Sequence, residues 1–326
     1  MADSKNSGVE FFRVVAAFAV VCIHSAPFVN YPSDTLYPLT NHLTRFAVPF
    51  FFTLSGYFFG VTLKKGKSVE ALFWKYFKRL VLLFLVWSVF YFLIPHAGIR
   101  EKLRLRPIDT LLEGGTTHLW YFTALISALA GLFLSLKRKR FDVFLAVSIL
   151  FFAAALWIHP YSVTHGAISL PFNLRNGPFF SSIFVAVGYW LSQQKRLPSL
   201  KVGYAVAALG WLCQELEIWA IWKHWRGDSL QDFTLGTLGF GVGMAVVALQ
   251  TRLPSALKGV ASFGKYTLGI YLVHFSLLGV IAPLFSARVN PTSLLWQFTY
   301  PLAVFLSALG VTAFLFRFRP LRPLFS

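Results

Sequence analysis

The sequence predicts an all-α polytopic membrane protein with about ten transmembrane helices, and three observations support this fold class. Of its 326 residues, 56% are hydrophobic and only 13% are charged, whereas a soluble domain carries about 25% charged residues. Apolar runs of the roughly 20 residues that a bilayer requires recur along the whole chain. Lysines and arginines cluster between these runs, as they do in cytoplasmic loops. We therefore expect residues 1–326 to form a single integral-membrane domain, without a soluble extracytoplasmic domain.

Each expected span is an apolar run bounded by polar or charged residues. The first run begins after about ten residues that contain neither a basic cluster nor a small-residue cleavage site, which indicates a retained helix rather than a signal peptide. The glycines of residues 236–245 do not follow a strand, so we interpret them as a helix-packing run. The ten expected spans cover residues 10–29, 43–63, 74–95, 119–136, 141–159, 177–193, 202–222, 232–250, 263–285 and 294–316.

The formal net charge of +18 reflects membrane topology. With the N-terminus inside, 21 of the 30 lysines and arginines lie at cytoplasmic ends of the spans. Cytoplasmic loops are enriched in these residues, so both termini are expected in the cytoplasm. Nucleic acid is therefore not an expected partner, whereas membrane lipids are.

One predicted external loop departs from this charge rule. The segment "GIREKLRLRPID" carries Arg100, Lys102, Arg104 and Arg106 in near-alternation. It is either a solvated segment resting on lipid headgroups or a patch that attracts an anionic acceptor such as a lipid-linked sugar phosphate.

The first span carries two ionisable side chains, Arg13 and His24, eleven residues apart. Eleven steps of about 100° return nearly to the starting direction, so both side chains share one helix face, roughly 16 Å apart along the axis. Intramembrane ionisable groups are functional by default. Glu10 lies one turn before Arg13 and can pair with it. The alternatives are an Arg13 that snorkels to the interface and a His24 packed against a carbonyl group.

Other polar side chains are expected at the depth of His24. Glu215 and Glu217 lie about 20 Å from the cytoplasmic side, so one of them could hold the tautomer of a catalytic histidine. If the span ended early, both would instead lie in the interface. His274, in the ninth span, is either a second polar member of the site or a structural histidine.

The segment "HLWYF", residues 118–122, opens the fourth span on its outer side. An aromatic belt accounts for Trp120 and Tyr121, which leaves His118 for contact with an acceptor.

The first cytoplasmic loop is strongly basic where the third span begins. Lys75, Lys78 and Arg79 are spaced to form one helix face. They either contribute ordinary cytoplasmic charge that contacts anionic lipid or clamp nucleotide phosphates. A GxSxG elbow, a Walker loop, an HExxH motif and a CxxC pair are all missing from the sequence, so a covalent nucleophile is not indicated.

Four segments of the sequence resemble motifs of the bacterial membrane acyltransferase-3 family. They are Glu10–Arg13 followed by His24, "RFAVPFFFTLSGYFFG" (45–60), "HLWYF" (118–122) and "GKYTLGIYLVH" (264–274), in the family's order. The resemblance implies a ten-helix core in the bacterial cytoplasmic membrane. Such a core moves an acyl group, usually acetyl, from cytoplasmic acyl-CoA to a hydroxyl of an extracytoplasmic glycan or lipid-linked sugar. The chain looks closest to single-domain O-acetyltransferases that act on surface-polysaccharide sugars.

The resemblance also implies roles for individual residues. His24 matches the family's essential histidine and Arg13 its essential arginine, whereas the family's Arg-x-x-Arg is replaced by Lys75-Tyr-Phe-Lys78 or Arg79. The expected catalytic residues are His24, Arg13 and Glu215; the expected acyl-CoA contacts are Arg13, Lys75, Lys78, Arg79, Ser55 and Tyr57; the expected acceptor contacts are His118, Trp120, Tyr121, His274 and Arg45. No metal is expected.

A direct-transfer mechanism connects these roles. The spacing of Arg13 and His24 is close to the length of a pantetheine arm, so CoA phosphates bound at the cytoplasmic mouth would place the thioester near His24. Histidine ionises near neutral pH and suits general-base work on the acceptor hydroxyl.

Two other functions stay open at this point. A transporter of a small polar solute would also carry polar residues near the midplane and a proline, Pro49, within a span. The same fold could instead use a succinyl or longer acyl donor.

Overall fold

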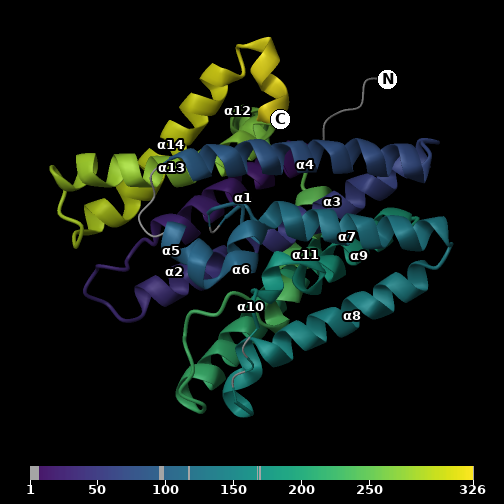
Figure 1. The fold of residues 1–326 in the computed structure, drawn as a ribbon, viewed down its shortest axis with the longest axis horizontal. Helices are drawn as coiled ribbons and strands as arrows, with labels where there is room; N and C mark the ends of the chain where they lie inside the picture. The colour runs from purple at the N-terminus through teal and green to yellow at the C-terminus, as the bar shows by residue number, and fades with distance from the viewer. Residues whose placement is uncertain (1–6, 95–98, 117, 167, 169, 326) are drawn as a thin grey trace. The chain divides into compact units, whose positions relative to one another are not determined.

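The fold is described from a computed structural model of the chain. It describes residues 7–94, 99–116, 118–166, 168 and 170–325. These residues form α-helices and short 3₁₀ helices and contain no strand (Figure 1). The α-helices are α1 (Ser7–Ser25), α2 (Leu36–Thr44), α3 (Ala47–Lys64), α4 (Val69–Leu93), α5 (Ile99–Leu105), α6 (Pro107–Leu112), α7 (Trp120–Lys137), α8 (Phe141–Ile158), α9 (Pro178–Gln193), α10 (Leu200–Lys223), α11 (Leu235–Gln250), α12 (Lys258–Ala261), α13 (Thr267–Ser286) and α14 (Leu294–Leu315). The 3₁₀ helices are η1 (Pro160–Thr164), η2 (Leu174–Asn176), η3 (Ser255–Leu257), η4 (Ser262–Tyr266) and η5 (Arg319–Leu324).

The predicted all-α polytopic class is confirmed. Seven helical stretches of the described chain are long and apolar enough to cross a membrane: Ser7–Ser25, Leu36–Lys64, Val69–Leu93, Trp120–Lys137, Phe141–Ile158, Ser255–Ser286 and Leu294–Leu315. The other three predicted spans coincide with α9, α10 and α11. Of these, α9 and α11 have only 16 residues each, and α10 carries two glutamates. The total of ten spans and the cytoplasmic position of both termini stay predictions.

The predicted second span, residues 43–63, lies within the helical stretch Leu36–Lys64, which is long and apolar enough to cross a membrane, but this stretch is not one continuous helix. The chain turns at Arg45 and Phe46, between α2 and α3. In a continuous helix the ring of Pro49 would collide with the carbonyl group of Arg45, four residues earlier. At the start of α3, by contrast, the missing N–H of a proline costs nothing.

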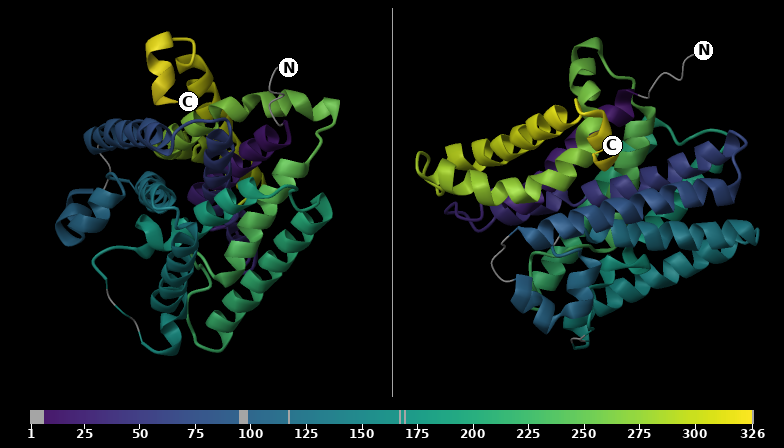
Figure 2. Two further views of the ribbon diagram at one scale, coloured as in Figure 1. Left: turned by 90° about the vertical axis from the view of Figure 1, so that its right-hand side faces the viewer. Right: turned by 45° about the horizontal axis from the view of Figure 1, so that its top comes forward.

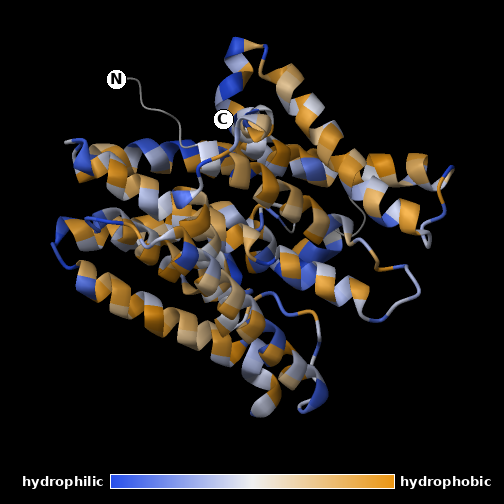
Figure 3. Ribbon diagram, turned by 180° about the vertical axis from the view of Figure 1, so that it is seen from behind, coloured by the Kyte–Doolittle hydropathy of each residue, from blue (hydrophilic) through white to orange (hydrophobic). Residues whose placement is uncertain are grey.

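Hydrophobic residues line the length of the helices, and hydrophilic residues gather at helix ends and in connecting turns (Figure 3). Several large apolar side chains point away from the protein; Leu85 is 54% exposed, Leu150 66% and Leu306 53%. In water such extensive exposed apolar surface would be unfavourable, but it suits contact with lipid.

The contacts divide the chain into two compact units, each built from separated segments. The first unit comprises the described residues of Met1–Val48, Pro198–Leu216 and Gly239–Ser326, and the second those of Pro49–Leu197 and Glu217–Leu238.

In the first unit, α1 packs against α13 and α14, which lie side by side (Figure 2), and α2, α12 and η4 also contact α1. The predicted helix-packing glycines are confirmed here. A Cβ on Gly243 would collide with the backbone of Ala207, and one on Gly210 with the backbone of Phe240. Glycine at these positions lets the backbones of α10 and α11 approach closely.

In the second unit, α7, α8 and α9 pack against one another and α4 packs against α7. The glycines of "SGYFFG" have a structural purpose there. A Cβ on Gly56 would collide with the carbonyl oxygen of Val185, and one on Gly60 with the hydroxyl of Ser192. Two glycines four residues apart thus let α3 lie directly on α9.

Candidate functional site

Arg13 lies in the first half of α1 and forms the predicted ion pair with Glu10. Its Nη1 lies 3.1 Å from Glu10 Oε1 and 3.4 Å from Oε2. About a third of the Arg13 side chain is exposed, against a fifth of that of Glu10. The pair leaves part of the guanidinium accessible, so Arg13 can still donate to an anion.

His24 lies near the other end of the same helix and is half-buried. Because α1 is continuous from Ser7 to Ser25, Arg13 and His24 share one face of this helix, as predicted. The small residues between Arg13 and His24, Ala17 and Val20, are buried.

The structure places His274 beside His24, with 5.2 Å between the two ring centroids. The His274 ring is completely buried. Its Nδ1 lies 2.7 Å from the carbonyl oxygen of Tyr271 and 3.2 Å from that of Ile270. Because carbonyl oxygens only accept hydrogen bonds, Nδ1 carries the proton and Nε2 is the acceptor nitrogen. Two residues predicted as members of one site are therefore neighbours, and one of them has a fixed tautomer.

Glu215 pairs with a histidine, but that histidine is His42, which the sequence analysis did not single out. The Glu215 Oε2 atom lies 2.9 Å from His42 Nδ1, whereas its Oε1 is buried and has no hydrogen-bond partner among the described residues. Gln214 donates to the carbonyl oxygen of His42 at 3.1 Å. The α10 helix continues past Glu215 and Glu217 to Lys223; the alternative that the membrane span ends early and leaves both glutamates in the interface stays a prediction.

Arg45, a predicted acceptor contact, follows α2 in the same unit. Its Nε donates to Asn41 Oδ1 at 2.9 Å. Nothing in the sequence connects residues 41–45 with residues 214 and 215, so only the fold could reveal this polar cluster.

The predicted acyl-CoA contacts other than Arg13 lie in the second unit. Lys75, Lys78 and Arg79 are exposed in the first half of α4. Ser55 donates to the carbonyl oxygen of Phe51 at 2.8 Å within its own helix, and Tyr57 is half-buried.

The contact of His118 with an acceptor stays a prediction. The side chain is buried, its Nδ1 lies 2.6 Å from Thr116 Oγ1, and the Tyr91 ring meets it edge-on at 5.0 Å. His118 is thus a packed residue in this structure. Trp120 and Tyr121 are half-buried, and the Tyr121 ring stacks on Phe52 at 4.7 Å.

Two of the four cations in the predicted external patch are neutralised by carboxylates. Lys102 pairs with Glu113, and Arg106 Nη2 lies 2.9 Å from Asp109 Oδ2. Arg104 is exposed, and the side chain of Arg100 lies outside the described part of the structure. The patch therefore carries less excess positive charge than its sequence indicates.

Arg175, which the sequence analysis missed, lies at the centre of this charged network. It pairs with Asp232 at 2.9 Å and with Glu113 at 3.2 Å, and its guanidinium lies 5.4 Å from the Trp120 ring centroid. Burial lowers the pKa of Arg175, but the neighbouring carboxylates of Asp232, Glu113 and Asp109 outweigh it, so the pKa is raised. Arg175 therefore stays charged, and its ion pairs link the segments that carry Glu113 and Asp232.

Comparison with known proteins identifies a family to which the chain is similar and several distant relatives. Residues 6–316 match the acyltransferase domain family. The chain is 28% identical over 298 residues to a serine/alanine racemase from Enterococcus gallinarum, which covers 83% of this chain and 40% of the racemase. It is also 28% identical over 205 residues to an amino-acid racemase from Enterococcus faecalis, which covers 58% of this chain and 28% of that protein. The chain thus matches less than half the length of these relatives. No solved structure matches it significantly.

Proposed function

We propose that this chain, which belongs to the acyltransferase-3 family, is an integral-membrane O-acyltransferase. In this proposal it takes an acyl group, most simply acetyl, from cytoplasmic acyl-CoA and transfers it to a hydroxyl of an extracytoplasmic glycan or lipid-linked sugar. The observation that carries the proposal is the His24–His274 pair on a unit whose first helix also presents Arg13.

The proposal includes ten spans in a bacterial inner membrane with both termini in the cytoplasm. The packing of the first unit supports this topology. A Cβ on Gly8, at the start of α1, would collide with the carbonyl oxygen of Thr251, just after α11, and a Cβ on Gly264 in η4 would collide with Glu10. Segments predicted to lie on the cytoplasmic side are therefore neighbours.

The chemistry needs one base and no covalent enzyme intermediate. A nitrogen of His24 takes the proton of the acceptor hydroxyl while the oxygen attacks the thioester carbonyl carbon. The new C–O bond forms, the C–S bond breaks, and the proton passes from His24 to the departing CoA sulfur. General-base catalysis of this kind contributes about 10²- to 10⁴-fold in rate.

His274 acts in this scheme as a positioning residue. Its Nδ1 proton is committed to backbone carbonyl oxygens, so the ring cannot easily change tautomer or rotate. A fixed neighbouring ring restricts the orientations open to His24, and such restriction is one source of catalytic efficiency.

Thiol release from acetyl-CoA by the purified protein tests the reaction class. We expect release that depends on an added sugar acceptor, together with acetyl groups on the cell-surface glycans of cells that contain the protein. Absence of both, in protein shown to be folded, contradicts the proposal.

A second candidate is transport of a small polar solute. The features that favour it are the polar residues expected near the midplane and Pro49 within a span, because substrate pathways of transporters carry such features. Serine and alanine, from the name of the similar serine/alanine racemase, serve as probes. Uptake of labelled serine or alanine into proteoliposomes distinguishes the candidates, since the acyltransferase proposal predicts no uptake above that of empty vesicles.

A further inference from the structure

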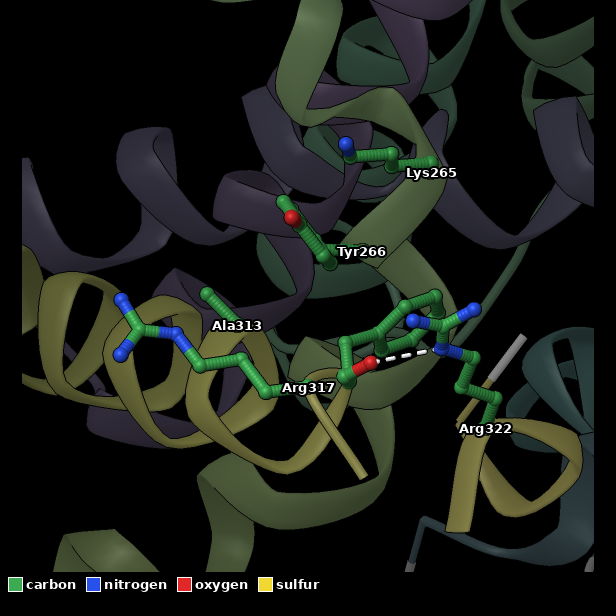
Figure 4. Close-up of a pocket in the computed structure, with 6 residues that line it drawn as sticks. Lys265, Tyr266, Ala313, Arg317 and Arg322 are labelled. Atoms are coloured by element: carbon green, nitrogen blue, oxygen red, sulfur yellow. Dashed lines mark hydrogen bonds between the residues drawn. The ribbon is translucent and has the colours of Figure 1, made fainter. Parts of the chain in front are cut away.

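A hollow of about 480 Å³ opens in the first unit, between the start of α13 and the end of α14 (Figure 4). Pockets of roughly 300–1,000 Å³ are typical for small ligands. The residues that line it are Lys265, Tyr266, Ala313, Phe316, Arg317 and Arg322. None of them belongs to the acyl-CoA contacts predicted from the sequence.

The hollow is strongly cationic. Lys265, Arg317 and Arg322 are all exposed, and their side chains lie on different sides of the Tyr266 ring in Figure 4. No carboxylate of the described chain pairs with Lys265 or Arg317. Arg322 Nε donates to the carbonyl oxygen of Phe316 at 2.7 Å, which fixes this side chain at the edge of the hollow. Lysine and arginine side chains arranged in this way suit phosphate groups.

Two aromatic rings form the wall of the hollow. The Tyr266 and Phe316 rings meet edge to face at 5.0 Å, and Lys265 Nζ lies 4.8 Å from the Tyr266 centroid. Aromatic faces of this kind bind nucleobases by stacking. The hollow therefore offers both a cationic site for phosphates and an apolar surface for a flat base.

The hollow is also close to the end of α1 that carries Arg13. Lys265 and Tyr266 belong to η4, which packs against α1. A Cβ on Gly264, the residue before Lys265, would collide with the Glu10 carboxylate, and Glu10 is the partner of Arg13. Glycine at position 264 thus permits the contact that brings the cationic hollow to the Arg13 end of the helix.

We infer that this hollow binds the phosphate-bearing adenosine end of the acyl-CoA donor, with Lys265 and Arg317 as phosphate ligands. The inference rests on the proposed function and adds a binding site to it. The headgroup phosphates of anionic lipids have the same charge chemistry as the CoA phosphates, but they need only exposed cations and no aromatic surface. The aromatic wall and the neighbouring Arg13 favour the nucleotide.

Binding measurements on the purified, full-length protein test this assignment. We would titrate the native protein, Lys265→Gln, Arg317→Gln and the double variant with CoA, adenosine 3′,5′-diphosphate and S-acetylpantetheine. Lys258→Gln and Arg319→Gln are matched controls, because both residues are exposed, lie in neighbouring segments and do not line the hollow. Since the substituted side chains are exposed, the variants should fold; monodispersity on size exclusion and the midpoint of thermal unfolding verify this.

Loss of a charged hydrogen bond should weaken binding of CoA and adenosine 3′,5′-diphosphate about tenfold or more in the double variant. Affinity for S-acetylpantetheine, which has no phosphate, should change by less than about twofold. Both controls should bind all three compounds as the native protein does.

Three results would overturn the assignment. The first is unchanged CoA affinity in folded single and double variants of a native protein that does bind CoA. The second is an equal loss for S-acetylpantetheine, which indicates general damage. The third is a loss of co-purified phosphatidylglycerol with unchanged CoA binding, which assigns the hollow to lipid. If the native protein neither binds CoA nor releases thiol from acetyl-CoA, the proposed function itself fails, and this outcome is distinct from the other three.

Discussion

The two units use the same kinds of ionisable side chain in different ways. In the second unit, Arg175 is surrounded by carboxylates, and Lys102 and Arg106 each have an acidic partner. In the first unit, Arg13 has one acidic partner and remains a third exposed, and two cations of the hollow have no carboxylate partner in the described chain. A cation enclosed by several carboxylates, such as Arg175, links segments of the chain, whereas a cation with an accessible side and no carboxylate on that side can bind a ligand.

Two histidines, one from each unit, also differ in their surroundings. His118 in the second unit is packed between Thr116 and Tyr91. His24 in the first unit is half-buried and lies beside a histidine whose tautomer the backbone fixes. Residue type alone therefore did not distinguish a structural histidine from a candidate base; the surroundings did.

The largest effect should come from replacing His24. We expect His24→Ala and His24→Gln to lower the turnover number for acetyl transfer about 10²- to 10⁴-fold, because neither side chain accepts a proton at neutral pH. CoA affinity and the thermal midpoint should stay near their native values. The measurement is acetyl transfer and CoA binding by detergent-purified variants.

Cys22→Ala serves as a control in the same helix and should transfer at near-native rate. If either His24 variant transfers as fast as the native protein, the base is another residue. His274 and Glu215 are then the next candidates.

The next effect tests the structural role of the second unit. Arg175→Gln should lower the free energy of unfolding by about 3 kcal/mol, because it leaves Asp232 without this cation and Glu113 with Lys102 alone. The exposed Arg226 offers a control, since Arg226→Gln should change stability by less than about 0.5 kcal/mol. Chemical or thermal unfolding in one fixed detergent checks both. Equal free energies of unfolding for Arg175→Gln and Arg226→Gln would show that the ion pairs of Arg175 do not stabilise the fold.

The apolar pattern predicted most helices, because a bilayer demands runs of a certain length and excludes charge from them. The turn at Arg45–Phe46 was not predicted, because the sequence is apolar on both sides of it and the turn follows from the backbone geometry of Pro49. For His24 and His274, which are 250 positions apart, the sequence predicted only a similar depth in the membrane and not that the two side chains are neighbours. The pairs His42–Glu215 and Arg175–Asp232 leave no local pattern at all, because they depend on which helices and loops become neighbours.

A moderate effect is expected at the basic start of α4. If Lys75, Lys78 and Arg79 attract CoA phosphates, their joint replacement by glutamine should weaken CoA binding about tenfold at low ionic strength and reduce its salt dependence. The triple Lys195→Gln, Arg196→Gln, Lys201→Gln variant removes three exposed cations that are also predicted to be cytoplasmic. It should bind CoA as the native protein does. Titration with CoA at two salt concentrations separates the two variants, and unchanged affinity in the α4 variant would assign its cations to topology alone.

The smallest effect concerns the predicted external loop and tests the comparison between the units most directly. Lys102 and Arg106 are already paired with carboxylates. Among the cations of this loop whose side chains the structure describes, Arg104 is therefore the exposed one without an ion pair. A single exposed charge is screened within about 10 Å at ordinary salt. Arg104→Gln should therefore raise the KM for an anionic acceptor by less than about twofold. The KM for a neutral acceptor and the affinity for CoA should not change. Steady-state kinetics with one acceptor of each kind provides the measurement. A selective rise of about fivefold or more for the anionic acceptor would mean that the loop recruits anions despite its ion pairs. The second unit would then contribute to substrate capture as well as to structure.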